Sequence, residues 1–262
     1  MNRYQYRFPR FLIDMIVFPS IYFWKSHLTD RTRGELAGTP TPPDVVRIID
    51  ALTDYFEVEI DKRRKSPGPD LVSALVQAHD EGDSLSSADL LNFVSLLLIA
   101  GNETTTNLIG NGMLALMRNP GQLKLLRDHR ELLPRAIEEM LRYDGPVQST
   151  ARFPNATADV GGREISRGTI AFVILAAADR DPAKFPEPEK FDITRDPNDH
   201  VAFGEGIHFC IGAPLARLEA AIAFGATLDR FSHLSLRDPA FMPTYKGSYI
   251  LRGLESLPMA VE

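Results

Sequence analysis

An α-dominated α+β fold is predicted by the order of the sequence patterns, by the composition and by the length. Helical patterns come first, short β-like pieces with glycine turns follow from about residue 145, and one more helical pattern precedes a C-terminal stretch of strands and turns. Hydrophobic residues make up 44% and charged residues 24%, which excludes a collagen-like or wholly disordered chain. A length of 262 residues allows one large domain or two smaller ones.

The charge balance and the single cysteine exclude several classes of protein. The chain carries 29 Lys and Arg against 35 Asp and Glu, a net charge of −6, so we expect no nucleic-acid partner bound through a large basic surface. One cysteine, Cys210, excludes an internal disulfide and a thiolate-cluster metal site. A lone thiol fits a reducing compartment, and we expect a cytoplasmic protein.

No stretch of the sequence predicts a membrane span. The two longest apolar runs cover residues 90–100 and 11–24, and both are shorter than the roughly 20 apolar residues that a bilayer-spanning helix needs. The second run also contains Asp14 and Pro19, and no cleavage motif of small residues follows it. Because arginines precede that run, an interfacial segment is an alternative, but we favour a packed helix or a pocket lid.

The front of the chain predicts two helices after a segment without a clear pattern. Residues 1–43 show no period and end in a cluster of Gly and Pro. Residues 44–64 carry apolar side chains on one helical face, and a second, short helix is expected over 70–80. The basic run 61–65 lies at the predicted end of the first helix, where we interpret it as a solvated helix end favoured by the helix dipole.

The longest predicted helix covers residues 87–118. Ser86 and Asp89 have the spacing of a capping box at its start. A helix of this length spans about 48 Å, and its apolar first half predicts a position across the middle of the protein. Asn119 and Pro120 are expected to end this helix and to cap the next one. Downstream we expect a helix over 131–143, a strand leading into a helix over 170–179, irregular structure over 181–199 and a helix over 212–231.

The lone cysteine lies in a glycine-rich stretch, residues 203–212, which reads FGEGIHFCIG. Its glycines allow tight turns and a close approach to a bound group. Cys210 stands just before a predicted helix start, where amide N–H groups and the helix dipole favour a thiolate. A thiolate is both a nucleophile and a soft ligand for iron. An inert, buried cysteine is the alternative interpretation.

Polar residues interrupt the longest helix at residues 100–105, which read AGNETT. An acid beside alcohols is costly to bury in an apolar segment unless it is paired. One interpretation is structural, with threonine hydroxyls bonded to their own helix and Glu103 in an ion pair. The other is a proton relay, in which Thr104 opens the helix locally and Glu103 passes protons inward.

Both stretches resemble motifs of the cytochrome P450 family. FGEGIHFCIG matches every position of that family's haem-binding signature, and AGNETT is similar to its oxygen-activation motif. The resemblance implies a cytochrome P450-like fold that holds haem b (iron protoporphyrin IX), with Cys210 as the proximal thiolate ligand of the iron. It further implies that Phe203 packs near this ligand and that His208 meets a haem propionate. Ala100 would let the long helix lie close to the porphyrin.

The resemblance also implies roles for residues elsewhere. Thr104 would stabilise iron-bound dioxygen species, and Glu103 would help to deliver protons. Arg152 matches the family's arginine that pairs with a haem propionate, and a guanidinium suits a carboxylate by its bidentate geometry. Residues 147–148 and 247–249 are expected to line the substrate pocket.

Glu139 and Arg142 are three residues apart on a predicted helix and so share a face. Taken alone, such a pair is a solvated surface contact that contributes little to stability. The resemblance implies instead the family's E-x-x-R pair, a buried structural network, for which Arg195 is the candidate third member.

The resemblance covers residues 44–262, the expected C-terminal haem-binding part of a P450-like domain, whereas residues 1–43 match the family poorly. A fold truncated at its N-terminus is therefore expected. The implied activity is that of a haem-thiolate monooxygenase for a small hydrophobic organic substrate. A separate ferredoxin and its reductase would supply electrons, so that NAD(P)H acts only indirectly. The alternatives are an inactive remnant, with or without haem, and a peroxide-using enzyme, against which Glu103 and Thr104 argue.

Overall fold

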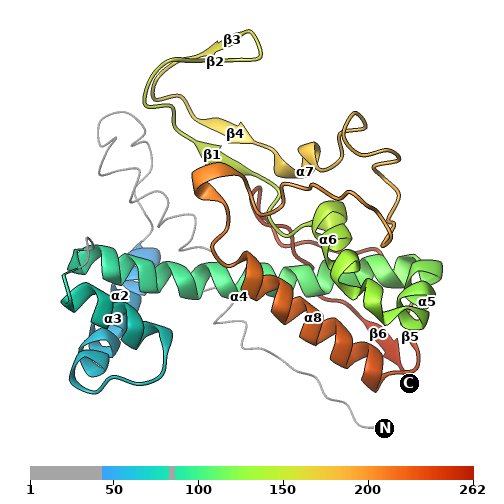
Figure 1. Ribbon diagram of the computed structural model, residues 1–262, viewed down its shortest axis with the longest axis horizontal. Helices are drawn as coiled ribbons and strands as arrows, with labels where there is room; N and C mark the ends of the chain where they lie inside the picture. Colours follow the sequence, from blue (N-terminus) through green and yellow to red (C-terminus); the bar gives the residue numbers. More distant parts are fainter. Residues whose placement is uncertain (1–42, 83–85) are drawn as a thin grey trace. The chain divides into compact units, whose positions relative to one another are not determined.

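The computed structural model describes residues 43–82 and 86–262 (Figure 1). These residues belong to two compact units, one ending at Glu103 and the other running from Thr104 to Glu262, so that the boundary falls inside the longest helix. Helices dominate both units and the strands are short, which confirms the predicted α-dominated α+β class. The expectations for residues 11–24 and 1–42 concern parts of the chain outside the described residues.

The first unit contains α2 (Pro43–Lys65), α3 (Leu71–Asp80) and the first half of α4 (Ser87–Arg118). These bounds confirm the three helices that the sequence predicts for this part of the chain. The helices share one small apolar core, made of Phe56, Ile60, Val76, Leu90 and Val94.

Side-chain caps fix the starts of α3 and α4. The Asp70 carboxylate accepts the Ser73 backbone N–H at 2.9 Å. At the start of α4 the bonds are reciprocal: the Asp89 N–H donates to Ser86 Oγ at 3.2 Å, and the Ser86 N–H donates to Asp89 Oδ2 at 3.0 Å. The predicted capping box is therefore confirmed, and it satisfies N–H groups that have no partner within the helix.

The basic end of α2 does more than face solvent. Arg63 binds Glu59 at 2.6 Å and Asp70 at 3.1 Å, and Arg64 binds Asp80 at 2.9 Å. The expectation of a purely solvated helix end is therefore wrong. Asp70 and Asp80 flank the two ends of α3, and the packing of α3 beside α2 brings them to the arginines.

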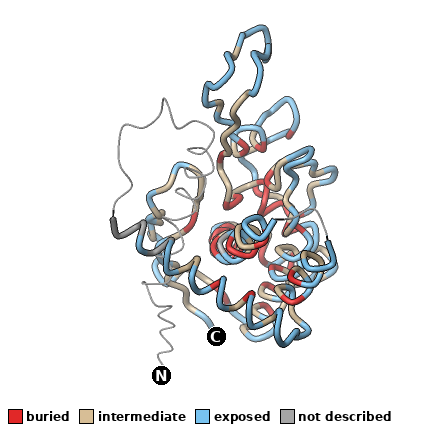
Figure 2. The backbone as a smooth tube through the Cα atoms, turned by 90° about the vertical axis from the view of Figure 1, so that its left-hand side faces the viewer, coloured by how far each residue is buried: buried red, intermediate tan, exposed pale blue. Residues whose placement is uncertain are grey.

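The second unit contains the second half of α4 together with α5 (Pro120–Asp128), α6 (Leu133–Asp144) and α8 (Ala213–Arg230). Its shorter helical turns are η1 (Arg130–Leu132), α7 (Leu175–Ala178) and η2 (Gly206–His208). Buried residues gather along the long helices of this unit (Figure 2). The fully buried members of the core include Leu116, Leu126, Ile137, Met140 and Phe224.

Gly112 marks the closest approach of α6 and α8 to α4. A Cβ atom at this position would lie 2.6 Å from Sδ of Met140 and 2.8 Å from Cζ of Phe224. Because both neighbours are almost completely buried, a side chain at position 112 would displace packed atoms. The absence of a side chain therefore lets the three helices share one core.

Asn119 separates α4 from α5, but its side chain does not cap α5 as expected. Its Nδ2 donates to the Ala115 carbonyl at 2.8 Å and so satisfies the C-terminal end of α4. The α5 helix starts with Pro120, which needs no N–H partner at that position. The prediction that Asn119 caps the next helix is therefore wrong, because the carbonyls that end α4 lie within reach of its amide.

Three antiparallel two-stranded sheets complete the second unit. They are β1 (Thr150–Arg152) with β4 (Ala171–Val173), β2 (Ala158–Val160) with β3 (Arg163–Ile165), and β5 (Leu234–Leu236) with β6 (Met259–Val261). The β2–β3 hairpin extends away from β1 and β4, and it is exposed along almost its whole length (Figures 1 and 2). The strands are therefore accessory to a helical core.

The later sequence predictions are also confirmed. β4 runs into α7 within residues 170–179, and residues 181–199 contain neither helix nor strand. No helix in the described part of the chain combines the length and the apolar character that crossing a bilayer requires.

Candidate functional site

Cys210 lies in a tightly turned loop that leads into α8. The Cys210 N–H donates to the Phe203 carbonyl at 2.9 Å and closes the loop. Gly204 and Gly206 have φ angles of 76° and 68°, in the left-handed region that favours glycine. The thiol is free and half-buried, and it stands three residues before the first residue of α8. The loop therefore presents the only sulfur of a cysteine in the chain close to a helix start.

Large apolar side chains beside the cysteine are exposed. Ile207, Phe209 and Ile211 are 98%, 51% and 77% exposed. Apolar side chains gathered at one exposed place indicate a binding surface. The neighbourhood of the thiol thus combines a soft donor with apolar surface, which is the chemistry that an iron porphyrin requires of its ligand site. The residues present fit haem.

A cation from α8 is held beside the loop. Arg217 donates to both carboxylate oxygens of Glu138, at 2.7 and 2.8 Å, and its guanidinium lies over the Phe203 ring at 4.6 Å from the centroid. Its hydrogen bonds to Glu138 raise the pKa of Arg217 above the usual value, and the Cys210 sulfur acts in the same direction. Arg217 is therefore within electrostatic reach of Cys210 and stabilises a thiolate there.

Glu138 joins Arg217 to His200. The His200 Nε2 lies 2.9 Å from Glu138 Oε2, and its Nδ1 accepts the Ala202 N–H at 3.2 Å. This pattern assigns the ring proton to Nε2, because Nδ1 serves as the acceptor. Burial acts to raise the pKa of Glu138, but the hydrogen bonds from Arg217 and His200 outweigh it and lower the pKa to about 2.

Glu139 and Arg142 form a completely buried ion pair on α6. The Arg142 Nε and Nη2 donate to the two Glu139 oxygens at 2.8 and 2.9 Å, and neither side chain has exposed surface. Arg195 donates to the same carboxylate at 3.2 Å, and the Asn198 amide donates at 3.1 Å. The structure therefore brings Glu139, Arg142 and Arg195 together, in place of a solvated surface pair.

This ion pair also holds the irregular segment that precedes the cysteine loop. Arg142 donates to the carbonyls of Asp179 and Pro188, both at 2.9 Å, and of Lys190 at 3.2 Å. The Asp179 carboxylate in turn accepts the Val201 N–H at 2.7 Å. Burial raises the pKa of Asp179. The segment has no secondary structure of its own, so these bonds satisfy its backbone and fix its path toward Phe203.

The predicted oxygen-activation residues lie on α4, on both sides of the unit boundary. Ala100 is exposed and Glu103 is 7% exposed, and both belong to the first unit. Thr104 is half-buried and opens the second unit, which also contains Cys210. Ala100 and Thr104 are four residues apart and so share a face of the helix.

The two predicted propionate partners lie in separate elements of the second unit. Arg152 ends β1, where its Nη1 donates to Thr150 Oγ1 at 2.9 Å and to the Ala151 carbonyl at 3.0 Å. His208 is exposed and ends η2, two residues before Cys210. The bonds to Thr150 and Ala151 engage one nitrogen of the Arg152 guanidinium and orient it.

The two segments predicted to line a substrate pocket lie side by side. Val147 forms a β-bridge with Leu251, and the Gln148 N–H donates to the Ile250 carbonyl at 2.8 Å. Residue 249 carries an almost fully exposed tyrosine, at 97%. The structure thus joins stretches that are about a hundred residues apart in the chain.

Sequence reasoning missed the partners of the cysteine loop. Glu138 and His200 had no assigned role, although together with Arg217 they form the charged cluster next to Phe203. The one signal was the pair of adjacent acids, Glu138 and Glu139, on a helix with a single buried face. Only the fold shows that the first acid turns toward the loop and the second toward the core.

Comparison with known proteins identifies the family. The family described as Cytochrome P450 matches residues 39–128 and 125–254. The chain belongs to the cytochrome P450 family. It is 51% identical over 211 residues to the cytochrome P450 monooxygenase PikC of Streptomyces venezuelae, a match that covers 79% of this chain and 50% of PikC. It is 40% identical over 242 residues to 6-deoxyerythronolide B hydroxylase of Saccharopolyspora erythraea, covering 91% of this chain and 58% of the hydroxylase.

Solved P450 structures share the fold. P450BioI in complex with hexadec-9Z-enoic acid ligated acyl carrier protein matches with a TM-score of 0.79 and 41% identity, over 84% of this chain and 56% of that chain. The predicted cytochrome P450-like fold is thus confirmed. The chain spans about half the length of the curated relatives it matches.

Proposed function

We propose that this chain is the haem-binding part of a cytochrome P450 monooxygenase, with Cys210 as the thiolate ligand of haem b. The observation that carries the proposal is the setting of Cys210: a half-buried thiol in a closed glycine loop, beside exposed apolar side chains and within reach of the Arg217 cation. When bound, the haem iron supplies the redox chemistry that activates dioxygen.

On the cysteine side, the chain holds the sulfur and adjusts its charge. The bond from the Cys210 N–H to the Phe203 carbonyl fixes the loop, and the Phe203 ring lies between the loop and the Arg217 guanidinium. Arg217 draws electron density from the thiolate, while Glu138 offsets part of that positive charge. Such surrounding groups adjust the donor strength of a metal ligand.

Arg152 and His208 are proposed to bind the haem propionates. A guanidinium forms paired hydrogen bonds with a carboxylate, and Arg152 is already oriented by its bonds to Thr150 and Ala151. His208 is exposed next to the cysteine loop, where its ring can donate to a carboxylate.

On the opposite side of the haem, we assign proton handling to α4. Thr104 is proposed to donate a hydrogen bond to bound dioxygen through its hydroxyl, and Glu103 to hold the proton that replenishes that hydroxyl. Ala100 lies on the same helical face as Thr104, and its small side chain leaves room for a flat group.

The proposed reaction inserts one oxygen atom of dioxygen into a substrate C–H bond and releases the other as water. It consumes two electrons and two protons. The electrons come from NAD(P)H through a separate ferredoxin and its reductase, and the setting is the cytoplasm. The relatives are named for 6-deoxyerythronolide B and for an acyl chain on a carrier protein, two different molecules, so we propose only a small hydrophobic organic substrate.

The test supplies isotopically labelled dioxygen to the haem-loaded protein with a ferredoxin, its reductase, NADPH and a panel of hydrophobic organic molecules. A product that carries one labelled oxygen atom supports the proposal. The absence of labelled product with every molecule of the panel contradicts it. Identity to named monooxygenases does not favour the alternative of an inactive remnant.

A further inference from the structure

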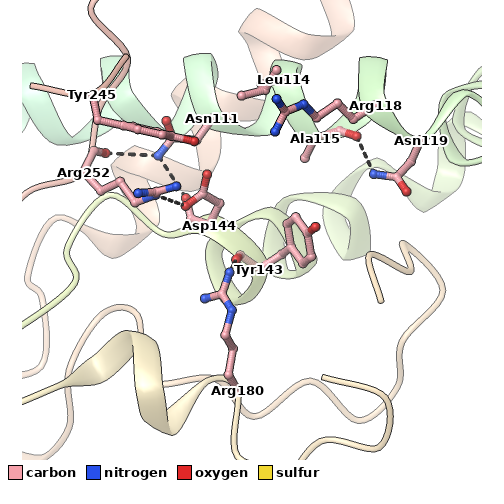
Figure 3. Close-up of a pocket in the computed structure, with 10 residues that line it drawn as sticks. All are labelled: Asn111, Leu114, Ala115, Arg118, Asn119, Tyr143, Asp144, Arg180, Tyr245 and Arg252. Carbon is pink, nitrogen blue, oxygen red and sulfur yellow. Dashed lines mark hydrogen bonds and ion pairs between the residues drawn. The ribbon is translucent and has the colours of Figure 1, made fainter. Parts of the chain in front are cut away.

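A polar cavity lies in the second unit, between the C-terminal ends of α4 and α6 and the C-terminal segment (Figure 3). Its volume is about 120 Å³, which is room for roughly four water molecules at about 30 Å³ each. Three arginines line it: Arg118 from α4, Arg180 from the residues after α7, and Arg252 from the C-terminal segment. None of its lining residues belongs to the cysteine loop, and the proposed haem chemistry uses none of them.

The cavity carries an excess of positive charge. Of the residues that line it, Asp144 alone is acidic, and Arg252 Nε donates to it at 2.6 Å. Burial raises the pKa of Asp144, whereas Arg252, Arg180 and Arg118 all act to lower it, so each guanidinium is within electrostatic reach. The C-terminal ends of α4 and α6 add about half a negative charge each. The three guanidiniums exceed these negative charges by about one unit.

Protein contacts engage only part of the arginines' donor capacity. Arg180 Nη2 donates to the Tyr143 carbonyl at 2.5 Å, and Arg118 Nη2 donates to the Phe241 carbonyl at 3.3 Å. Glu189 lies 3.5 Å from Arg180, but it is largely exposed and therefore screened by water. A guanidinium has five N–H donors, so each arginine has the capacity to bind a further acceptor.

Asn111 lines the cavity at its most buried side and has an acceptor without a partner. Its side chain is 1% exposed, and its Nδ2 donates to the carbonyls of Asp144 and Arg252, both at 3.0 Å. These two bonds fix the amide orientation, because a flipped amide would set its oxygen against two carbonyl oxygens. The Asn111 Oδ1 is buried, and no hydrogen-bond donor reaches it within the described part of the chain. Such an acceptor favours a ligand that brings a donor.

We propose that this cavity binds a small oxyanion that carries a hydrogen, of which hydrogen phosphate is the simplest example. The arginines bind its charged oxygens, and its O–H group donates to Asn111 Oδ1. One ligand thereby meets both demands of the cavity. Water meets only the second demand, and a fully deprotonated anion such as sulfate meets only the first.

Calorimetric titration of the protein at neutral pH and constant ionic strength tests the proposal, with inorganic phosphate and sulfate as the two probes. Sulfate matches phosphate in shape but has no hydrogen to donate at this pH. We expect saturable phosphate binding that is about tenfold tighter than sulfate binding, since a missing bond to a buried acceptor costs that much. General salt effects act on both anions alike. Equal affinities, or no saturable phosphate binding, would overturn the proposal.

A matched pair of variants locates the binding. Arg118→Gln removes an exposed guanidinium of the cavity and should weaken phosphate binding by about tenfold. Arg130→Gln removes an exposed arginine of the same unit that instead pairs with Asp229 on the surface, and should leave the affinity unchanged. An Arg118→Gln protein that binds phosphate as tightly as the unaltered chain overturns the proposal, as does an equal loss in both variants.

Discussion

The Glu139 carboxylate and the Arg142 guanidinium are both fully buried and are joined by two hydrogen bonds, of 2.8 and 2.9 Å. Arg142 also binds three carbonyls between residues 179 and 190. One ion pair thus orders the irregular segment that positions the cysteine loop, and its loss is expected to affect both stability and the haem site.

Replacing Arg142 by Met should lower the free energy of unfolding by about 3–5 kcal/mol, because it leaves the buried Glu139 charge without its main partner. Urea unfolding measures this change. Lys124→Gln is the control: Lys124 and Asp128 form an exposed pair on α5, and its loss should cost less than about 1 kcal/mol. If the two variants lose the same free energy, Arg142 does not have the structural role assigned here.

Glu138 should make stability depend on pH in the acid range. Its pKa is lowered from 4.5 to about 2 by hydrogen bonds from Arg217 and His200, which outweigh burial. A carboxylate with a lowered folded-state pKa contributes stability above its unfolded pKa, and this contribution disappears as the pH falls from about 4.5 toward about 2. Because the side chain is partly exposed, we expect a contribution of about 1–2 kcal/mol.

Comparing the unaltered chain with Glu138→Gln isolates this contribution. The difference in unfolding free energy should be constant near neutral pH and should shrink below about pH 4.5. Asp144 and Asp179 have raised pKa values and act in the opposite direction, but they are present in both proteins and cancel in the difference. A difference that does not change with pH is incompatible with the assigned bonds.

Two glycines of the second unit should respond oppositely to a methyl group. Gly112→Ala places a Cβ against Met140 and Phe224 and should destabilise the fold by about 1–3 kcal/mol through overpacking. Gly121→Ala, in α5, meets open space and should stabilise by up to about 1 kcal/mol through helix propensity. Thermal unfolding of both variants checks the signs. Equal stability of the two proteins would show that α6 and α8 do not approach α4 at Gly112 as described.

Thr104→Ala should uncouple electron use from product formation, if the proposed proton relay is correct. Reducing equivalents should then appear as hydrogen peroxide, because bound dioxygen lacks the hydroxyl that directs proton delivery. Thr106→Ala, an exposed position on the same helix, is the control and should keep the original ratio of product to peroxide. The ratio is measured from NADPH consumed, product and peroxide. Unchanged coupling in Thr104→Ala would reject the relay.

Local patterns were sufficient to predict the helices and one part of the site. Apolar periodicity places α2 and α4, and the spacing of Ser86 and Asp89 predicts a cap that forms as expected. Glu139 and Arg142 are neighbours on one helix, so their pairing is readable from an i, i+3 spacing.

Contacts between distant parts of the chain could not be predicted in this way. Glu138 meets His200 and Arg217, which are 62 and 79 residues further along the chain. Asn111 meets Asp144 and Arg252, which are 33 and 141 residues away. Asn119 caps the helix behind it because of where a carbonyl of α4 lies. No periodicity connects such residues, and packing alone decides whether a polar side chain faces a partner, a cavity or water.

The most direct test of the central claim is the difference spectrum that carbon monoxide produces on the reduced, haem-loaded protein. We predict a Soret band characteristic of thiolate ligation in the unaltered chain, and its loss in Cys210→Ala. Persistence of that band in Cys210→Ala, or its absence from the unaltered haem-loaded protein, would contradict the assignment of Cys210 as the ligand of the iron.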